Sequence, residues 1–154
     1  MRTFTPDLLG LDVAEVDAQV EGRWSLPAHT YFDQDVYEFE LAAIFSHRWQ
    51  YFAPREWLTE PGSVVTGDIG ALPVVVTRGE DGELHGFLNV CRHRGYRVVA
   101  GDCSTRWLQC GYHAWTYRLD GSLARSPGTE DDPSFCAEEM SLLPVAVDQW
   151  AQGV

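Results

Sequence analysis

The stretch "NVCRHRGYR" at residues 89–97 places a cysteine and a histidine two positions apart, directly after an apolar segment. A second stretch, "CGYHAW" at residues 110–115, places a cysteine and a histidine three positions apart. Each pair follows a segment with strand-like character, so both pairs are expected in loops at the ends of strands. Two thiols and two imidazoles in two loops are a typical ligand set for zinc or for an iron–sulfur centre.

The distribution of the four ligands between the loops separates these two possibilities. Zinc fingers and ribbons usually leave two to four residues between paired cysteines, whereas one residue separates Cys91 from His93. In a Rieske 2Fe–2S centre, two cysteines hold one iron and two histidines hold the other. Loops that carry Cys91 with His93 and Cys110 with His113 therefore each supply one ligand to each iron. The spacing favours a Rieske cluster and leaves a zinc-stabilised binding module as the alternative.

Short antiparallel strands are expected around these loops. The expected strands cover residues 63–69, 72–78, 83–90, 106–110, 115–119, 122–125 and 142–150. They are short, rich in Val, Ile and Phe, and separated by Gly-containing turns at 79–82 and 120–121. This pattern predicts a mainly β, antiparallel fold.

The N-terminal third has a different pattern. Isolated apolar residues among acids, up to Pro27, indicate an arm. A short helix is expected over about 35–47, where Asp35 and Glu38 could form a capping box. Its predicted packing face consists of Tyr37, Leu41, Ile44 and Phe45. We therefore predict an N-terminal arm and helix over 1–50 and a metal-binding β domain over 51–154.

Charge and composition narrow the possible partners and location. The 154 residues include 11 basic and 23 acidic side chains, for a net charge of −12. Such a chain is not expected to bind nucleic acid or anionic membranes, and it favours a partner with a basic face. No apolar run has the length of a membrane span, and the N-terminus lacks the pattern of a secretory signal. We expect a cytoplasmic protein, in which Cys103 and Cys136 are free thiols.

At this point a family resemblance becomes clear. "CRHRG" followed by "CGYHAWTYRLDG" resembles the Rieske domain of the α-subunits of aromatic ring-hydroxylating oxygenases, and the similarity extends over roughly residues 25–154. It implies a Rieske-type antiparallel β-sandwich with cluster-binding loops, preceded by an N-terminal arm and one short helix. It also implies a 2Fe–2S cluster held by Cys91, His93, Cys110 and His113.

The resemblance gives expectations for the neighbours of the cluster. Gly95 would let backbone amides approach it, Arg94 would pair with a carboxylate of a neighbouring domain or remain an exposed charge, and Trp115 would tune the cluster or pack in the core. Respiratory Rieske proteins carry a disulfide where this chain has Tyr96 and Tyr112, and a serine hydroxyl where it has Trp115. The resemblance therefore implies a low potential, on the order of −150 mV rather than +300 mV.

The resemblance also implies a function. In these oxygenases, which form trimers, a second domain holds a mononuclear Fe(II) through two histidines and a carboxylate. Residues 114–154 contain no histidine, and the spacing of His29, His47 and His85 does not suit this site. We expect a chain without catalytic residues that relays electrons from a ferredoxin or flavin reductase to a catalytic domain or subunit for O₂-dependent hydroxylation. The alternative is a stand-alone Rieske ferredoxin, which would not need the helix at 35–47. The substrate, an aromatic ring or a quaternary amine, stays open, as does mono- versus dioxygenation.

Overall fold

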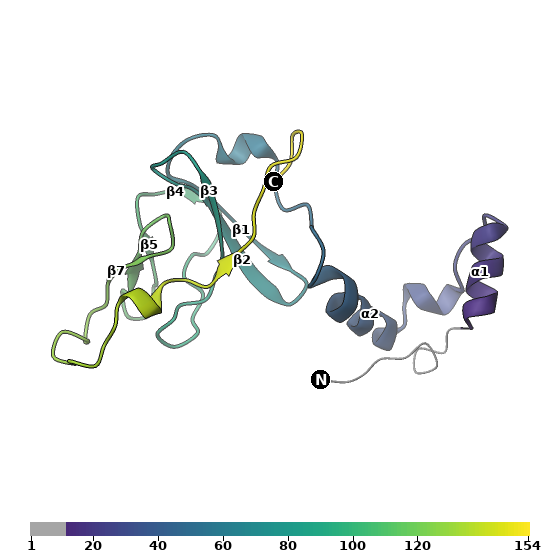
Figure 1. Ribbon diagram of the computed structural model, residues 1–154, viewed down its shortest axis with the longest axis horizontal. Helices are drawn as coiled ribbons and strands as arrows, with labels where there is room; N and C mark the ends of the chain where they lie inside the picture. The colour runs from purple at the N-terminus through teal and green to yellow at the C-terminus, as the bar shows by residue number, and fades with distance from the viewer. Residues whose placement is uncertain (1–11) are drawn as a thin grey trace. The chain divides into compact units, whose positions relative to one another are not determined.

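In the computed structural model, which describes residues 12–154, the chain divides into two units, Met1–Trp49 and Gln50–Val154 (Figure 1). Within residues 12–154, every strand lies in the second unit. A five-stranded antiparallel sheet has the order β4-β1-β2-β3-β8. Its strands are β1 (Ser63–Ile69), β2 (Leu72–Arg78), β3 (Leu84–Leu88), β4 (Cys103–Ser104) and β8 (Pro144–Val145). A three-stranded sheet has the order β5-β6-β7, with β5 (Leu108–Gln109), β6 (Thr116–Tyr117) and β7 (Leu123–Arg125).

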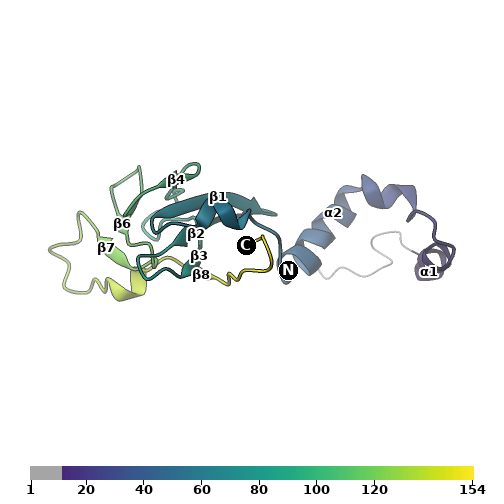
Figure 2. The ribbon, with the colours of Figure 1, turned by 90° about the horizontal axis from the view of Figure 1, so that it is seen from above.

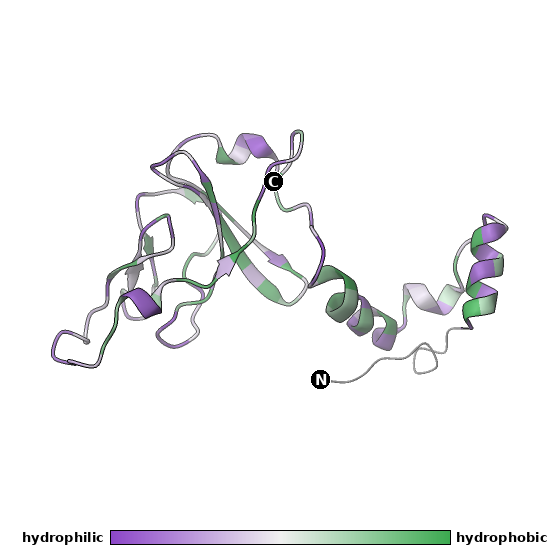
Figure 3. Ribbon diagram, viewed as in Figure 1, coloured by the Kyte–Doolittle hydropathy of each residue, from purple (hydrophilic) through white to green (hydrophobic). Residues whose placement is uncertain are grey.

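The central strand β2 explains why the larger sheet is covered on both faces. Its residues Val74, Val75 and Val76 are all buried, as is typical of a strand without a solvent face. Val75 belongs to a core shared with the three-stranded sheet, whereas Val74 and Val76 belong to a second core on the opposite face. The second core also includes Leu58 of the short helix η4 (Arg55–Leu58). Figure 2 shows β1, β2, β3 and β8 one after another with β6 and β7 to one side, and Figure 3 shows apolar residues along the larger sheet.

The turn between β6 and β7 brings the two sheets together. Gly121 has a φ of +82°, and a Cβ at this position would overlap the ring of Phe87 in β3. Phe87 and Leu123 of β7 lie in the same core. Only glycine therefore combines this backbone conformation with this close contact.

The outer edge of β1 is paired over a short length. β4 pairs only with Ser63 and Val64 of β1. Further along, the amide of Thr66 donates to a carboxylate oxygen of Asp102 at 2.8 Å. Asp68 forms an ion pair with Arg97 at 2.8 Å. Charged side chains thus lie beside the part of β1 that extends beyond β4.

The predicted mainly β, antiparallel fold is confirmed, with differences in extent. β1 and β2 have the predicted bounds, whereas the other predicted strands are shorter, and β8 covers only two residues of the segment 142–150. β4 was not predicted, because its two residues are exposed and have no apolar alternation. Short strands of this kind form where the tertiary fold brings backbones together, and the side-chain pattern does not reveal them.

The first unit is helical in its described residues. It contains α1 (Val13–Glu21), η2 (Ala28–Tyr31), α2 (Gln34–Glu40) and the π-helical turn η3 (Leu41–Phe45), and a further short helix, η5 (Glu138–Met140), lies in the second unit. α1 falls in the predicted arm. It was missed because it has no buried residue and so no apolar face that the sequence pattern could show.

The predicted helix over 35–47 corresponds to α2 and η3 and differs from the prediction in two respects. Asp33, rather than Asp35, is the N-cap, and its carboxylate accepts hydrogen bonds from the amides of Asp35 and Val36. Val36 is the buried residue of α2, whereas Tyr37, Ile44 and Phe45 on the predicted packing face are exposed. The apolar spacing therefore identified a helix but did not identify its buried side.

Candidate metal centre

Two loops with the same backbone hydrogen bonds carry the four predicted ligands. In the first ligand loop (residues 91–96), the amide of Cys91 donates to the carbonyl of Tyr96 at 2.8 Å and the amide of Gly95 donates to the carbonyl of Cys91 at 2.9 Å. In the second ligand loop (residues 110–115), the amide of Cys110 donates to the carbonyl of Trp115 at 2.9 Å. The amide of Ala114 donates to the carbonyl of Cys110 at 3.1 Å. Each loop is therefore closed by its own backbone, independently of the other.

The fifth residue of each loop has a left-handed backbone conformation. Gly95 has a φ of +70° and Ala114 a φ of +56°. A Cβ built on Gly95 would meet nothing within 4 Å. The backbone conformation therefore favours glycine at this position. The expectation that Gly95 lets backbone amides approach the cluster stays a prediction. Ala114 adopts a similar conformation with a Cβ, which strains the backbone.

Asn89 anchors the first ligand loop to the sheet. Its side chain is fully buried, and its amide nitrogen donates to the carbonyl of Val99 at 2.8 Å. Its side-chain oxygen accepts from the amides of Val98 and Val99 at 3.1 and 3.0 Å. Sequence reasoning missed this residue, although a polar residue between the apolar end of a strand and a cysteine ligand was a possible indication. Because three hydrogen bonds satisfy it, Asn89 fixes the path of the chain beyond the loop.

The structure brings the four predicted ligands together in two pairs, Cys91 with Cys110 and His93 with His113. Cys91 and Cys110 are buried free thiols. The rings of His93 and His113 meet edge to face, with 4.7 Å between their centroids. The Nδ1 atom of His113 is buried and has no hydrogen-bond partner, which leaves a ring nitrogen available for a metal.

The arrangement of these side chains suits two irons better than one zinc ion. No group of three or more His, Cys, Asp or Glu side chains among residues 12–154 converges on a site for a single metal ion. A structural zinc site needs four such ligands around one ion. A Rieske cluster needs only two protein ligands on each iron. The residues present therefore fit a binuclear cluster.

The groups around Cys110 have opposing effects on the pKa of its thiol. Burial raises its pKa, the amides of Tyr112 and His113 act in the opposite direction, and the neighbouring Cys91 raises it further. The buried Cys110 thiol is therefore costly to ionise without a cation beside it. The pair is therefore suited to a metal centre that stabilises both thiolates.

Tyr117 forms hydrogen bonds with the first ligand loop, and sequence reasoning did not predict these contacts. Its hydroxyl is buried, accepts from the amide of Arg92 at 3.0 Å and lies 3.3 Å from the sulfur of Cys91. Because the hydroxyl oxygen already accepts from the amide of Arg92, the hydroxyl proton is free to point at the sulfur. Burial raises the pKa of Tyr117, so the hydroxyl keeps this proton. A hydrogen bond to a ligand sulfur tunes an iron–sulfur centre.

Aromatic rings cover both histidines. Trp115 is buried and stacks on His93, with 4.8 Å between centroids and 9° between planes. Tyr112 is exposed and stacks on His113 at 3.7 Å. Burial, followed by the nearby charges of His113 and Arg94, lowers the pKa of His93. The structure thus places three of the four predicted neighbours, Arg94, Tyr112 and Trp115, beside the histidines.

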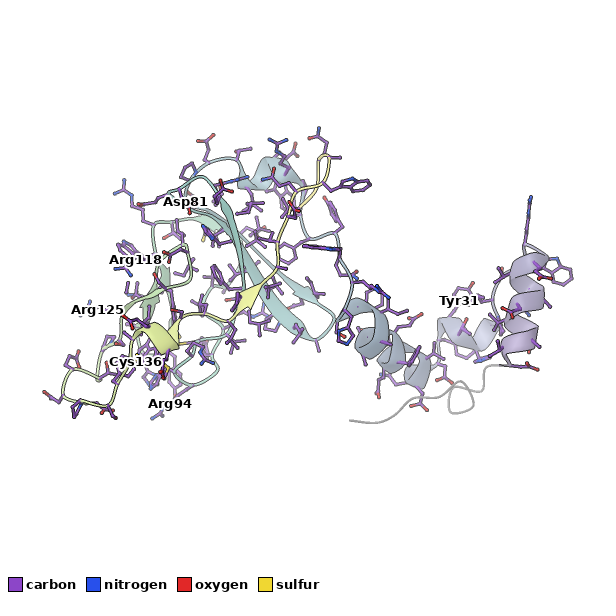
Figure 4. The ribbon with its side chains drawn as sticks, viewed as in Figure 1. Tyr31, Asp81, Arg94, Arg118, Arg125 and Cys136 are labelled. Carbon is purple, nitrogen blue, oxygen red and sulfur yellow. The ribbon has the colours of Figure 1, made fainter. Side chains whose placement is uncertain are left out.

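The remaining cysteines and histidines have other surroundings. Cys103 lies in β4, and burial together with the charge of Asp102 raises the pKa of its thiol. Cys136 is a free thiol in the second unit, labelled with Arg94 in Figure 4. His85 pairs with Asp81 at 3.1 Å.

Comparison with known proteins identifies the domain. The family described as Rieske [2Fe-2S] domain matches residues 48–144, which include both ligand loops. The chain belongs to this Rieske family. Its cofactor is a Rieske-type 2Fe–2S cluster, as the donor set already indicated.

Relatives of this Rieske domain are oxygenase subunits. The chain is 33% identical over 135 residues to the carnitine monooxygenase oxygenase subunit of Escherichia coli K12, covering 87% of this chain and 36% of the relative. It is 32% identical over 152 residues to the chloroplastic choline monooxygenase of Spinacia oleracea, covering 97% and 35%. It is 40% identical over 125 residues to the glycine betaine monooxygenase oxygenase subunit of Pseudomonas aeruginosa, covering 80% and 29%. The chain thus spans about a third of the length of these relatives.

Solved structures give the same assignment. A quaternary ammonium Rieske monooxygenase in complex with L-carnitine has a TM-score of 0.79 and 31% identity, and the match covers 99% of this chain and 42% of that one. Naphthalene 1,2-dioxygenase from Rhodococcus sp. bound to indole has a TM-score of 0.81 and 32% identity, with 91% and 32% covered. The resemblance to Rieske oxygenase α-subunits is therefore confirmed. Separately, no helix within residues 12–154 is both long and apolar enough to cross a membrane.

Proposed function

We propose that this Rieske domain is the electron-relay part of an oxygenase, receiving single electrons from a reductase or ferredoxin and passing them to a mononuclear iron in a catalytic domain or subunit. The observation that carries the proposal is the placement of one cysteine and one histidine on each of two matched loops, with the thiols buried and the histidine rings in contact. The family and relatives support a role in an oxygenase system.

The side chains around the centre have distinct tasks in this proposal. Cys91, His93, Cys110 and His113 would hold the 2Fe–2S cluster, which supplies one-electron transfer when bound. The hydroxyl of Tyr117 lies beside the sulfur of Cys91, and the amides of Tyr112 and His113 lie beside that of Cys110. They would stabilise negative charge added to the bound cluster. The buried ring of Trp115 excludes water from one side of His93.

For the substrate of the whole system, we propose a quaternary ammonium compound. Carnitine, choline and glycine betaine monooxygenases are among the relatives with the higher identities, from 32% to 40%. An aromatic ring, which the family resemblance implied, is the second candidate, because naphthalene 1,2-dioxygenase matches with a TM-score of 0.81. A role in aromatic catabolism is therefore the less supported of the two.

For the docking of a partner, we propose that Arg94 pairs with a carboxylate. The net charge of −12 predicted a basic partner, but the first ligand loop carries exposed Arg92 and Arg94 with no ion-pair partner in the described chain. Charges close to the point of electron exchange steer an encounter more strongly than distant charges do. A partner should therefore present acidic groups at this loop.

The test of the relay uses the reconstituted chain. Chemical analysis should give two irons and two sulfides, and the reduced protein should give an EPR signal with an average g below the free-electron value. Cys110→Ser should remove this signal, while Cys103→Ser, the matched control, should retain it. Zinc in place of iron after anaerobic reconstitution, or a cluster that no ferredoxin or flavin reductase reduces, would overturn the proposal.

The docking test compares two variants of equal charge. Arg94→Glu and Arg55→Glu change the net charge equally, but Arg55 lies on η4 in a different segment. Only Arg94→Glu should slow reduction by an acidic ferredoxin, and the wild-type rate should fall as salt is added. Equal effects of both variants, or a rate that rises with salt, would show that the overall charge governs docking.

A further proposal concerns catalysis by the chain alone. Because no three ligand-type side chains converge among residues 12–154, the reduced chain with O₂, Fe(II) and substrate should form no hydroxylated product. Product coupled to electron uptake without a second protein would contradict this expectation.

A further inference from the structure

Few contacts join the two ligand loops to each other. Their backbones are closed separately, and no backbone hydrogen bond or disulfide links residues 91–96 to residues 110–115 in the described chain. Apart from the packing of Cys91, Cys110 and Trp115 in one core, ring contacts connect the two loops in the described chain. On the buried side, His93 meets His113 and Trp115. On the exposed side, Tyr96 meets Tyr112 with 5.7 Å between centroids and 50° between planes.

The exposed contact continues onto a predicted ligand. Tyr112 stacks on His113 with centroids 3.7 Å apart and planes 29° apart, so Tyr96, Tyr112 and His113 form a row of three rings across both loops. The backbone of Tyr96 is fixed because its carbonyl accepts from the amide of Cys91. Its ring therefore projects from a fixed backbone and lies against Tyr112 of the second ligand loop.

The exposure of these tyrosines argues against simple core packing. Tyr96 is 56% exposed and Tyr112 is 54% exposed, so the pair buries little surface on its own. The rings of Tyr112 and His113 are nevertheless in direct contact. A partly exposed aromatic pair contributes little to the stability of a whole domain, but it can hold one side chain in one orientation.

We propose that Tyr96 and Tyr112 form an aromatic clasp that joins the two ligand loops and positions His113 for the metal centre. The clasp rests on the proposed assignment of His113 as a ligand. It closes the exposed side of the centre, as Trp115 closes the side of His93. Tyr96 acts through Tyr112, so both are positioning residues.

The test measures how fast iron leaves the loaded protein. Tyr96→Ala and Tyr112→Ala should each speed iron transfer to a chelator by about two- to ten-fold, the effect expected from one lost aromatic contact. Tyr96→Phe and Tyr112→Phe keep the rings and should behave as the wild type. Tyr31→Ala removes an exposed ring from the first unit and should have no effect.

A double-variant cycle and spectroscopy separate a clasp from two independent effects. The double alanine variant should release iron no faster than the faster single variant, because both changes break the same row of rings. The EPR spectrum of the reduced protein should change in both alanine variants and in neither phenylalanine variant, whereas far-UV circular dichroism should not change.

Three results would overturn the clasp. The first is faster iron release in Tyr112→Ala but not in Tyr96→Ala. The second is a double variant in which the two increases in release rate multiply. The third is an unchanged release rate in both variants. If the tyrosine variants release iron in the expected pattern but no reductase reduces the cluster, the proposed relay is overturned and the clasp stands. A chain that binds no cluster would overturn both.

Discussion

Exchanging glycine and alanine at the fifth positions of the two ligand loops should change the free energy of unfolding in opposite directions. Gly95 and Ala114 share the left-handed conformation, with φ values of +70° and +56°. An alanine in this region costs about 1–2 kcal/mol relative to a right-handed conformation. The larger freedom of glycine in the unfolded chain costs about 0.5–1 kcal/mol. Ala114→Gly should therefore raise the free energy of unfolding by about 0.5–1 kcal/mol, and Gly95→Ala should lower it by a similar amount.

Packing should contribute little to either change. Ala114 is exposed, so removing its methyl group loses little buried surface. A Cβ at Gly95 meets no atom within 4 Å, so it adds no clash. The expected shift in the midpoint of thermal unfolding is about 2–4 °C for each kcal/mol in a chain of this size.

The assay is thermal unfolding of the loaded protein under anaerobic conditions, followed by far-UV circular dichroism. Ala151 is a matched control, because it has a φ of +53° in a turn outside the ligand loops. Ala151→Gly should stabilise the protein to a similar extent without changing the rate of iron release. If Ala114→Gly destabilises the protein while Ala151→Gly stabilises it, the assignment of strain to the second ligand loop is wrong.

Three further predictions concern other residues. Tyr117→Phe removes the hydroxyl donor from the ligand sulfur and should make the reduction potential about 20–60 mV more negative in voltammetry; an unchanged or raised potential would contradict the hydrogen bond. Replacing Cys103 and Cys136 together with serine should leave the iron and sulfide content unchanged, and a folded but colourless double variant would show that one of them is a ligand. Gly121→Ala should lower the unfolding midpoint more than Gly95→Ala does, because a Cβ there overlaps the ring of Phe87, and equal losses in a urea titration would refute this steric argument.

The sequence was most informative where local pattern and burial agree. β1 and β2 have the predicted bounds because their apolar residues are buried on a continuous sheet. The ligand loops could be found because their residue types and spacing are specific to one cofactor. β4 and α1 were missed because neither buries a side chain, so nothing in their apolar pattern distinguishes them from a loop or an arm.

The neighbours of the ligands were harder to predict than the ligands. The role of Tyr117 depends on the amide of Arg92, which sits 25 residues away in the sequence. The fixed path beyond the first ligand loop depends on Asn89, whose three hydrogen bonds all go to backbone atoms of Val98 and Val99. Such contacts depend on backbone geometry, which residue spacing alone does not give.

The outer edge of β1 has a consequence for self-association. An exposed strand edge is a template for pairing with another chain, and natural sheets often protect such edges with charged side chains. Here the carboxylate of Asp102 accepts a hydrogen bond from the amide of Thr66. The ion pair of Asp68 with Arg97 lies further along the same strand. An incoming strand would have to displace the carboxylate and desolvate both charges. We therefore expect the two acidic residues to disfavour edge-to-edge pairing of this sheet with another chain.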